Sequence, residues 1–306
     1  MAEPVGARAP RLALPRLAMA PRHVAVALAV AAVWGFNFIA AKAALGQIPP
    51  LLLTALRFAV VAAVLVPFAP RPERLLPVFV VSVCLGVVHF ALMFWAMALT
   101  TRIAPIAVAV QLSVPFGALL AAFLLNDRLG RRRLLGMALA LAGVVLMTFD
   151  PVVLAELDAL GLAVASAFLW ALGSVLSKRL RVADAFTLNA YMALLATPQL
   201  LVLSLLFERD HVAVLTGADL AAWAAVLYMA LAVTVFGYGV WFSLLRRYPV
   251  NLVMPFQLTV PPFAALFSML VLGEVLTWQV AAGGLVTIVG VGVVLLRRPE
   301  LGRAQV

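Results

Sequence analysis

The sequence predicts an all-α membrane protein with ten transmembrane helices, arranged as two inverted five-helix repeats. Three observations lead to this prediction: apolar residues occur in long runs, basic residues are sorted between loops, and the second half of the chain repeats motifs of the first. Of the 306 residues, 66% are hydrophobic and 11% are charged, whereas a soluble domain has roughly a quarter charged residues. The composition therefore argues against a soluble protein.

The apolar runs are each long enough to cross a hydrocarbon core about 30 Å thick. A run of about 18 or more apolar residues is typical of a transmembrane helix, whereas helices of soluble cores are shorter and apolar on one face. The predicted spans are 23–45, 49–69, 75–99, 104–126, 132–150, 158–178, 185–207, 219–244, 250–273 and 278–296.

The Lys and Arg residues predict how these spans are oriented, because cytoplasmic loops carry an excess of both. With a cytoplasmic N-terminus, only Arg102 and Arg209 fall outside, while Lys42 and Arg57 lie within spans or at their ends. The rest fall inside: Arg8, Arg11, Arg16, Arg22, Arg71, Arg74, Arg128, Arg131, Arg132, Arg133, Lys178, Arg179, Arg181, Arg246, Arg247, Arg297, Arg298 and Arg303. We expect a multi-pass protein of the cell (inner) membrane with both termini cytoplasmic.

The formal net charge of +10 is therefore an orientation signal, reinforced by attraction to anionic lipid. The lipid bilayer is the expected partner, and nucleic acid is not. The single cysteine, Cys84, cannot form an intramolecular disulfide, and no spacing of metal ligands is present. We expect no metal and no cofactor, and the chain lacks the Walker-type loop of ATP-driven pumps.

Four motifs of the first half recur in the second half in the same order, at offsets of 136, 146, 147 and 147 residues. The pairs are Trp34 and Lys42 with Trp170 and Lys178, Gln111 and Pro115 with Gln257 and Pro261, Asp127 with Glu274, and Gly136, Ala140 and Gly143 with Gly283, Thr287 and Gly290. Five spans per repeat is an odd number, so the second copy enters the membrane from the opposite side, as in many secondary transporters.

These boundaries divide the chain into four parts. Residues 1–22 are predicted to be a disordered basic cytoplasmic tail, 23–150 the first five-helix repeat, 151–297 the second repeat, and 298–306 a cytoplasmic tail.

Several of these segments resemble motifs of the EamA-type transporters of the drug/metabolite transporter superfamily. They are Val33–Phe38 for its first helix, Pro49-Pro50 followed by Leu56–Phe58 for its second, and Asp127–Leu129 with Gly273-Glu274 for its hairpin turns. The resemblance covers roughly 24–297 and implies ten helices, cytoplasmic termini and export of amino acids or other metabolites. The sequence departs from it at Asn126-Asp127, where the family usually has Gly-Glu, and its second repeat has Gly173 where the first has Asn37.

Two proline-containing pairs are candidates for the substrate pathway. A proline lacks the N–H that bonds the carbonyl four residues back, and here that carbonyl belongs to Gln111 (for Pro115) or Gln257 (for Pro261). We expect each pair to present a free carbonyl beside a side-chain amide, which is tolerated only next to protein or a wet cavity. A structural kink, with the amide bonding a neighbouring helix, is the alternative.

Aromatic and polar residues at mid-span are further candidates. Trp34, Asn37 and Trp170 lie about halfway across their spans, although tryptophans usually lie at the membrane surface. They are expected to form walls or gates of a cavity, or simply to pack against small residues. Tyr238 is predicted to line the same cavity.

Two ionisable side chains lie within predicted spans, where charged groups are unfavourable. A central Arg costs about 2.5–3.5 kcal/mol on insertion scales, so Arg57 needs the anion of a substrate or bonds to backbone carbonyls. His89, the only histidine in a predicted span, is either a proton relay or a packing residue. Lys42 and Lys178 are expected to extend to the membrane surface.

The small residues near Gly143 and Gly290 predict close helix packing, either within the chain or between protomers, so a homodimer is left open.

Together these features predict a secondary transporter that exports small metabolites, such as amino acids or their derivatives, by alternating access. No catalytic residues are expected, since an intramembrane enzyme would need a nucleophile–base pair or a metal cluster, and a non-transporting scaffold would need no inverted repeat. The predicted cavity suits small, neutral or zwitterionic, partly apolar solutes, with Arg57 as partner for a carboxylate. Its predicted lining is Trp34, Asn37, Gln111, Trp170, Tyr238 and Gln257.

Overall fold

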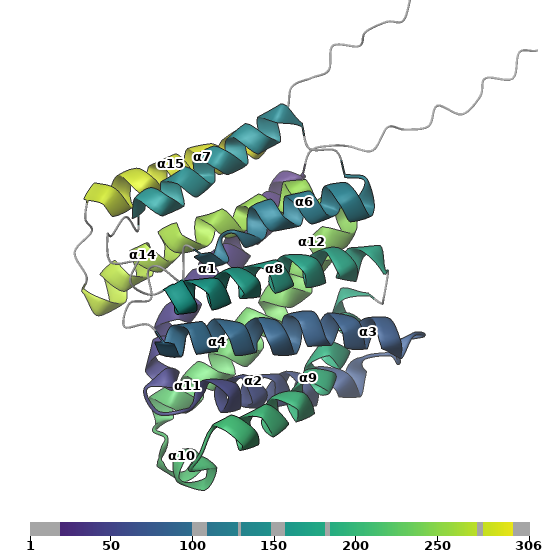
Figure 1. Ribbon diagram of the computed structural model, residues 1–306, viewed down its shortest axis with the longest axis vertical. Coiled ribbons are helices and arrows are strands. Elements are labelled where there is room, and N and C mark those ends of the chain that lie inside the picture. The colour runs from purple at the N-terminus through teal and green to yellow at the C-terminus, as the bar shows by residue number, and fades with distance from the viewer. Residues whose placement is uncertain are drawn as a thin grey trace, which may run out of the picture.

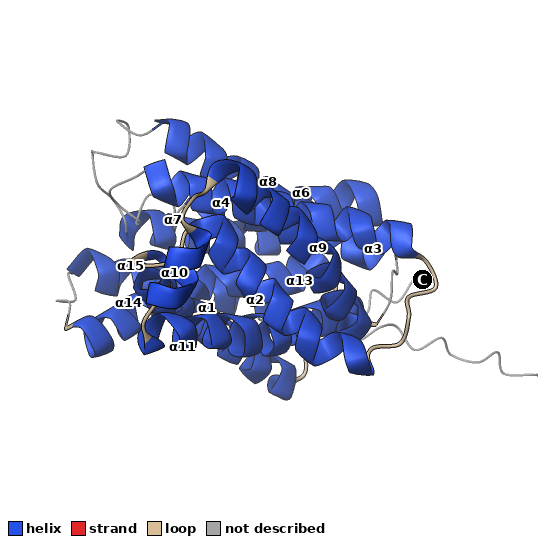
Figure 2. Ribbon diagram, turned by 90° about the horizontal axis from the view of Figure 1, so that it is seen from below, coloured by secondary structure: helices blue, strands red, loops and turns tan. Residues whose placement is uncertain are grey.

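The computed structural model is a bundle of long helices, and the residues it describes contain no strand (Figures 1 and 2). It describes residues 19–99, 109–127, 130–147, 157–180, 184–273 and 278–295. Most of both predicted tails therefore lies outside the described residues, although the first helix already begins at Pro21, inside the predicted N-terminal tail.

The first half contains α1 Pro21–Leu45, α2 Pro50–Leu65 with the 3₁₀ segment η1 Val66–Phe68, α3 Leu75–Val81, the π-helix η2 Ser82–Val88, α4 His89–Leu99, α6 Ser113–Leu125 and α7 Arg131–Met147. The second half contains α8 Leu157–Arg179, α9 Ala185–Phe207, α10 His211–Gly217, α11 Leu220–Tyr228, the π-helix η4 Met229–Tyr238, α12 Gly239–Arg247, α13 Val250–Val253, the 3₁₀ segment η5 Met254–Thr259, α14 Val260–Leu272 and α15 Trp278–Leu295.

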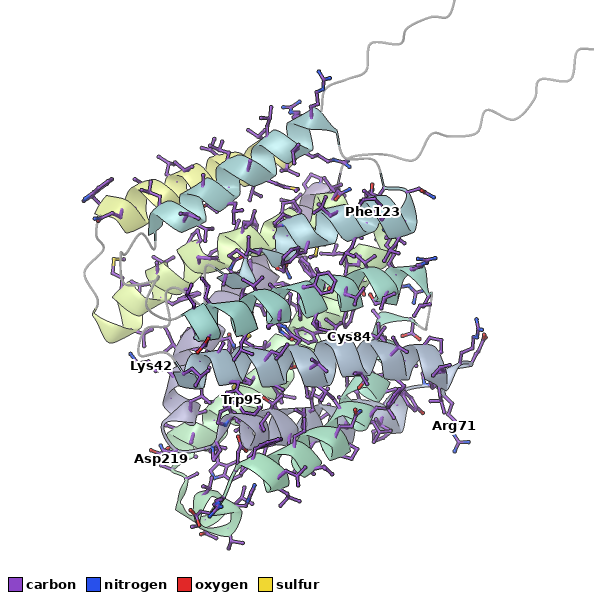
Figure 3. The ribbon with its side chains drawn as sticks, in the orientation of Figure 1. Lys42, Arg71, Cys84, Trp95, Phe123 and Asp219 are labelled. Atoms are coloured by element: carbon purple, nitrogen blue, oxygen red, sulfur yellow. The ribbon has the colours of Figure 1, made fainter. Side chains whose placement is uncertain are left out.

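Seven helical stretches of the described chain are long and apolar enough to cross a membrane, and two shorter apolar helices, 113–125 and 281–294, accompany them. The surface of the bundle fits a lipid environment, because Phe123 is 82% exposed and Trp95 45% exposed at its outside (Figure 3). Arg71 lies at one end of the bundle, and Lys42 and Asp219 lie at the other (Figure 3). The chain is thus a multi-pass membrane protein, while the number of ten spans stays a prediction.

The turn after α6 explains one departure from the family pattern. Asn126 has a φ of 52°, and Gly273, 147 positions later, has a φ of 68°. This left-handed conformation at a helix end favours glycine, and asparagine is the common replacement. Asn126 therefore preserves the turn although the glycine is absent.

The glycine faces of α7 and α15 pack against each other within the chain, side by side in Figure 1. A Cβ added at Gly143 would lie 2.6 Å from the Gly283 carbonyl oxygen, and one at Gly290 would lie 2.4 Å from the Ala140 nitrogen. Thr287 donates to the Gly283 and Ala140 carbonyls at 2.8 and 3.3 Å. Because the chain itself covers these faces, they no longer argue for a homodimer.

The remaining helices surround α1 and α8. α1 packs against α11, η4 and α14, whereas α8 packs against η2, α4 and α6, and α2 packs against α9. The short helix α10 was not predicted, because seven residues between two long helices carry no periodic signal.

Candidate functional site

A single cavity gathers most of the residues singled out from the sequence. Its volume is about 110 Å³, below the roughly 300–1,000 Å³ typical of sites for drug-sized ligands. The described lining is Trp34, Asn37, Phe38, Arg57, His89, Phe90, Met93, Val110, Gln111, Ser113, Trp170, Val233, Tyr238, Gln257 and Val260. Both halves of the chain contribute to it.

Pro115 and Pro261 are not among the lining residues. Each lies in the first turn of a helix, α6 or α14, where a missing N–H leaves no intrahelical bond unmade. They start these helices beside the cavity instead of forming its wall.

The expectation of free carbonyls at the glutamines is wrong. The Gln111 carbonyl accepts a bond from the Val114 N–H at 3.0 Å, and the Gln257 carbonyl accepts one from the Val260 N–H. In both places the backbone tightens to a three-residue step, so the donor one position before the proline replaces the missing one. Proline changes the hydrogen-bond pattern here but leaves no acceptor free.

The side chain of Gln257 joins the two halves. Its Oε1 accepts a hydrogen bond of 3.2 Å from the hydroxyl of Ser113, and both residues are buried. The amide thus bonds a neighbouring helix, as in the structural alternative, while it also lines the cavity.

Three aromatic rings form one wall. Trp34 and Trp170 meet edge to face with centroids 5.6 Å apart, and Tyr238 lies 5.9 Å from Trp34 and 5.3 Å from Trp170. The Trp34 indole N–H donates to the Val233 carbonyl at 3.3 Å. Edge contacts of this kind contribute about 0.5–1.5 kcal/mol beyond area burial, so they stabilise this arrangement of the three rings.

Arg57 is only 1% exposed. Its Nε donates to the Thr234 hydroxyl at 2.6 Å, and that hydroxyl donates in turn to the Met229 carbonyl at 2.9 Å. The guanidinium carbon lies 4.8 Å from the centre of the Phe90 ring and 5.5 Å from that of Tyr238. The predicted bond to backbone carbonyls is replaced by a side-chain hydroxyl and aromatic faces.

His89 is tied to α8. Its Nδ1 lies 3.0 Å from the Ser166 carbonyl oxygen and 2.8 Å from the Ser166 hydroxyl oxygen. The Ser166 hydroxyl donates to the His89 carbonyl at 3.0 Å. The ring also lies 5.2 Å from that of Trp170. These bonds position the histidine, and its role as a proton relay stays a prediction.

Bulky, buried side chains close the cavity on the side of the bundle where Arg71 lies. On α12 the residues after Tyr238 include Trp241 and Phe242, each 1% exposed, and Met254 and Phe256 of η5 are fully buried. Trp241 and Phe242 thus lie on α12 between Tyr238, which lines the cavity, and Arg247 at the end of the helix. On α1 the lining instead extends from Trp34 to Phe38, towards Lys42.

A hydrogen-bond network holds this closed end. The Tyr248 hydroxyl lies 2.6 Å from the His23 Nδ1 and 3.3 Å from the backbone nitrogen of Ala20, which donates to it. Lys178 donates to the Tyr248 carbonyl, and Arg247 lies 3.1 Å from the other nitrogen of His23. The network joins the start of α1, the end of α8 and the turn after α12.

The model of the EamA-like transporter family matches the chain twice, over residues 22–149 and 158–296. The chain belongs to this family. It is 33% identical over 276 residues to a protein of Salmonella typhimurium named probable amino-acid metabolite efflux pump, covering 87% of this chain and 92% of that one. A protein of the same name from Escherichia coli is 30% identical over 281 residues, covering 89% and 94%.

Among solved structures, a crystal structure aligns with a TM-score of 0.75 and 21% identity, covering 90% of this chain and 96% of the other. At this identity the likeness shows the fold alone. As an EamA-like protein the chain is a transporter, and its multi-pass membrane fold agrees with that.

Sequence reasoning missed the apolar part of this EamA-like cavity. Phe90, Met93 and Val260 line it, but in a chain that is 66% hydrophobic an apolar residue carries no signal of its position. Thr234 was missed as the partner of Arg57, because the two lie 177 positions apart.

Proposed function

We propose that this chain exports small metabolites, such as amino acids or their derivatives, across the inner membrane, and that the cavity is its substrate site. The observation that carries the proposal is the convergence of Trp34, Asn37, Arg57, His89, Gln111, Trp170, Tyr238 and Gln257 on one cavity. The names of the two enterobacterial relatives support export and the substrate class.

The proposal includes ten spans in two inverted repeats with cytoplasmic termini. The helix contacts support this arrangement, because the partners of α1 in the second half correspond to those of α8 in the first. The π-helices add to it, since η2 begins at Ser82 and η4 begins at Met229, 147 residues later. The excess of basic residues in alternate loops supports the orientation.

Transport proceeds by alternating access in this proposal. With the Arg71 end cytoplasmic, the structure is closed inside by Trp241, Phe242 and the network around Tyr248. Opening to the cytoplasm requires that network to separate, while the end with Lys42 closes. Inverted repeats make the two conformations related to each other.

Alanine substitution of the two glutamines tests the site. We expect Gln111→Ala and Gln257→Ala each to lower transport by about tenfold, because one or two hydrogen bonds of about 1 kcal/mol each are lost with the amide. Transport is measured as efflux of candidate metabolites from cells that overproduce the protein, normalised to the amount in the membrane.

The matched control is Phe123→Ala, on the lipid-facing surface of α6 and 82% exposed, which should leave transport unchanged. Wild-type efflux by both glutamine variants would show that the substrate passes elsewhere.

A further inference from the structure

Arg57 brings a positive charge to the cavity that no described acidic residue balances. None of the described lining residues is Asp or Glu. Thr234 and Tyr238, the polar side-chain neighbours of the guanidinium, both carry neutral hydroxyl groups. An uncompensated cation at low dielectric interacts strongly with any anion that enters, so the charge of the site itself selects among ligands.

Three buried polar atoms around this cavity have no hydrogen-bond partner: Arg57 Nη2, Trp170 Nε1 and Asn37 Oδ1. Each buried group without a partner is unfavourable by about 1–3 kcal/mol, more if it is charged. Two of the atoms are donors and one is an acceptor. A ligand that accepts at two points and donates at one would satisfy all three.

The guanidinium is held in place by its other contacts, while Nη2 has no hydrogen-bond partner. Its Nε is fixed by Thr234 at 2.6 Å, and the rings of Phe58, Phe90 and Tyr238 lie 4.8–5.5 Å from the guanidinium carbon. An arginine fixed in this way binds a carboxylate with little loss of side-chain freedom.

We infer that the site prefers carboxylates of net charge −1 that carry an aromatic or apolar group and an uncharged N–H or O–H next to the carboxylate, such as N-acylated amino acids or hydroxy acids, over zwitterionic amino acids. The carboxylate meets Arg57 and Trp170, the neutral donor meets Asn37, and the apolar group lies along the aromatic wall. The inference rests on the proposed function, because it assigns a substrate class to the same cavity.

A free amino acid fits less well for two reasons. Its ammonium would find one neutral acceptor, Asn37 Oδ1, among the three unpartnered atoms of the cavity-lining residues, and a buried charge needs fuller pairing than that. The Arg57 charge would also repel it. A neutral ester or amide would leave Arg57 without its anion.

Three ligands that share the phenylalanine side chain test the inference: N-acetyl-L-phenylalanine with charge −1, zwitterionic L-phenylalanine, and neutral N-acetyl-L-phenylalanine amide. Binding to the purified full-length protein is followed by tryptophan fluorescence, and transport by counterflow in proteoliposomes. We expect the monoanion to bind at least about tenfold more tightly than the other two. Arg57→Gln should remove this preference, and Arg57→Lys should keep part of it.

The ligand series with the wild-type protein tests the preference for the monoanion even if Arg57→Gln fails to fold. Equal or tighter binding of the zwitterion overturns the inference, as does a charge preference that persists in Arg57→Gln. Failure of all three ligands to bind at millimolar concentration overturns it too. If another solute is then exported and Gln257→Ala blocks that export, the proposed function stands without the inference.

Discussion

The helices α1 and α8 carry the same spacing of Trp and Lys, yet the structure uses the two helices differently. Trp34 and Trp170 both line the cavity. The indole of Trp34 is bonded to the Val233 carbonyl, whereas the indole nitrogen of Trp170 has no partner. The Trp34 indole is therefore bonded within the protein, whereas the Trp170 indole has a donor without a partner.

The position three residues after each tryptophan shows a second difference. Asn37 lines the cavity, but its counterpart Gly173 has no room for a side chain, since an added Cβ would lie 2.4 Å from the Cγ of Leu85 in η2. Duplication supplied two equivalent positions, and packing against η2 left a polar group at only one of them.

The lysines near the ends of the two helices, Lys42 and Lys178, also make different contacts. Lys178 donates to the Tyr248 carbonyl at the closed end, while Lys42 is exposed at the opposite end. In the proposed mechanism the two ends alternate between closed and open. The contrast between these lysines shows that the repeated positions make different contacts at the two ends: Lys178 is hydrogen-bonded and Lys42 is exposed.

Exchanging the residues that lie three positions after each tryptophan should have the largest effect on the yield of folded protein. Gly173→Asn places a Cβ against Leu85, and overpacking of this kind costs about 1–3 kcal/mol or more, so we expect a large loss of folded protein. The reverse exchange, Asn37→Gly, should fold normally and lower transport only. Size-exclusion chromatography of fluorescent fusions measures the folded yield.

The double variant Gly173→Asn with Leu85→Ala serves as its control, because removal of the leucine side chain should restore part of the yield. A wild-type yield of Gly173→Asn would mean that η2 is not packed against α8 at this point.

Replacing each lysine separately by methionine should have an intermediate effect on stability. Lys178→Met loses a charge-assisted bond at the closed end, and we expect the free energy of unfolding to fall by about 1–2 kcal/mol, since the group is partly exposed. Lys42→Met should leave stability unchanged. Thermal unfolding in detergent compares them, and equal losses in both variants would remove the asymmetry between the ends.

Replacing the two tryptophans by phenylalanine should give the smallest effect on stability. Trp34→Phe loses one hydrogen bond of about 1 kcal/mol, while Trp170→Phe loses none in the empty protein. Trp170→Phe should weaken binding of N-acetyl-L-phenylalanine more than Trp34→Phe does, with isothermal titration as the measurement. A larger drop in melting temperature for Trp170→Phe than for Trp34→Phe would contradict this account.

The helices could be predicted from the sequence because apolar runs of this length have few other solutions. Polar cavity residues such as Gln257 were found for the same reason, since an amide in an apolar run needs a partner. The bond from Val260 to the Gln257 carbonyl was missed, because proline specifies which donor is absent but not how the backbone replaces it. The pairing of Arg57 with Thr234 depends on tertiary packing that no local pattern reports.

The unbalanced charge of Arg57 has an electrical consequence. If the cavity holds a monoanion, the loaded site is neutral, and the empty site carries one positive charge. When the empty transporter returns from its outward-facing to its inward-facing conformation, that charge moves towards the negative cell interior. A membrane voltage of 100 mV contributes about 2.3 kcal/mol per elementary charge, equivalent to a concentration ratio of about 50. A voltage of this size would drive anion efflux against a gradient without proton exchange.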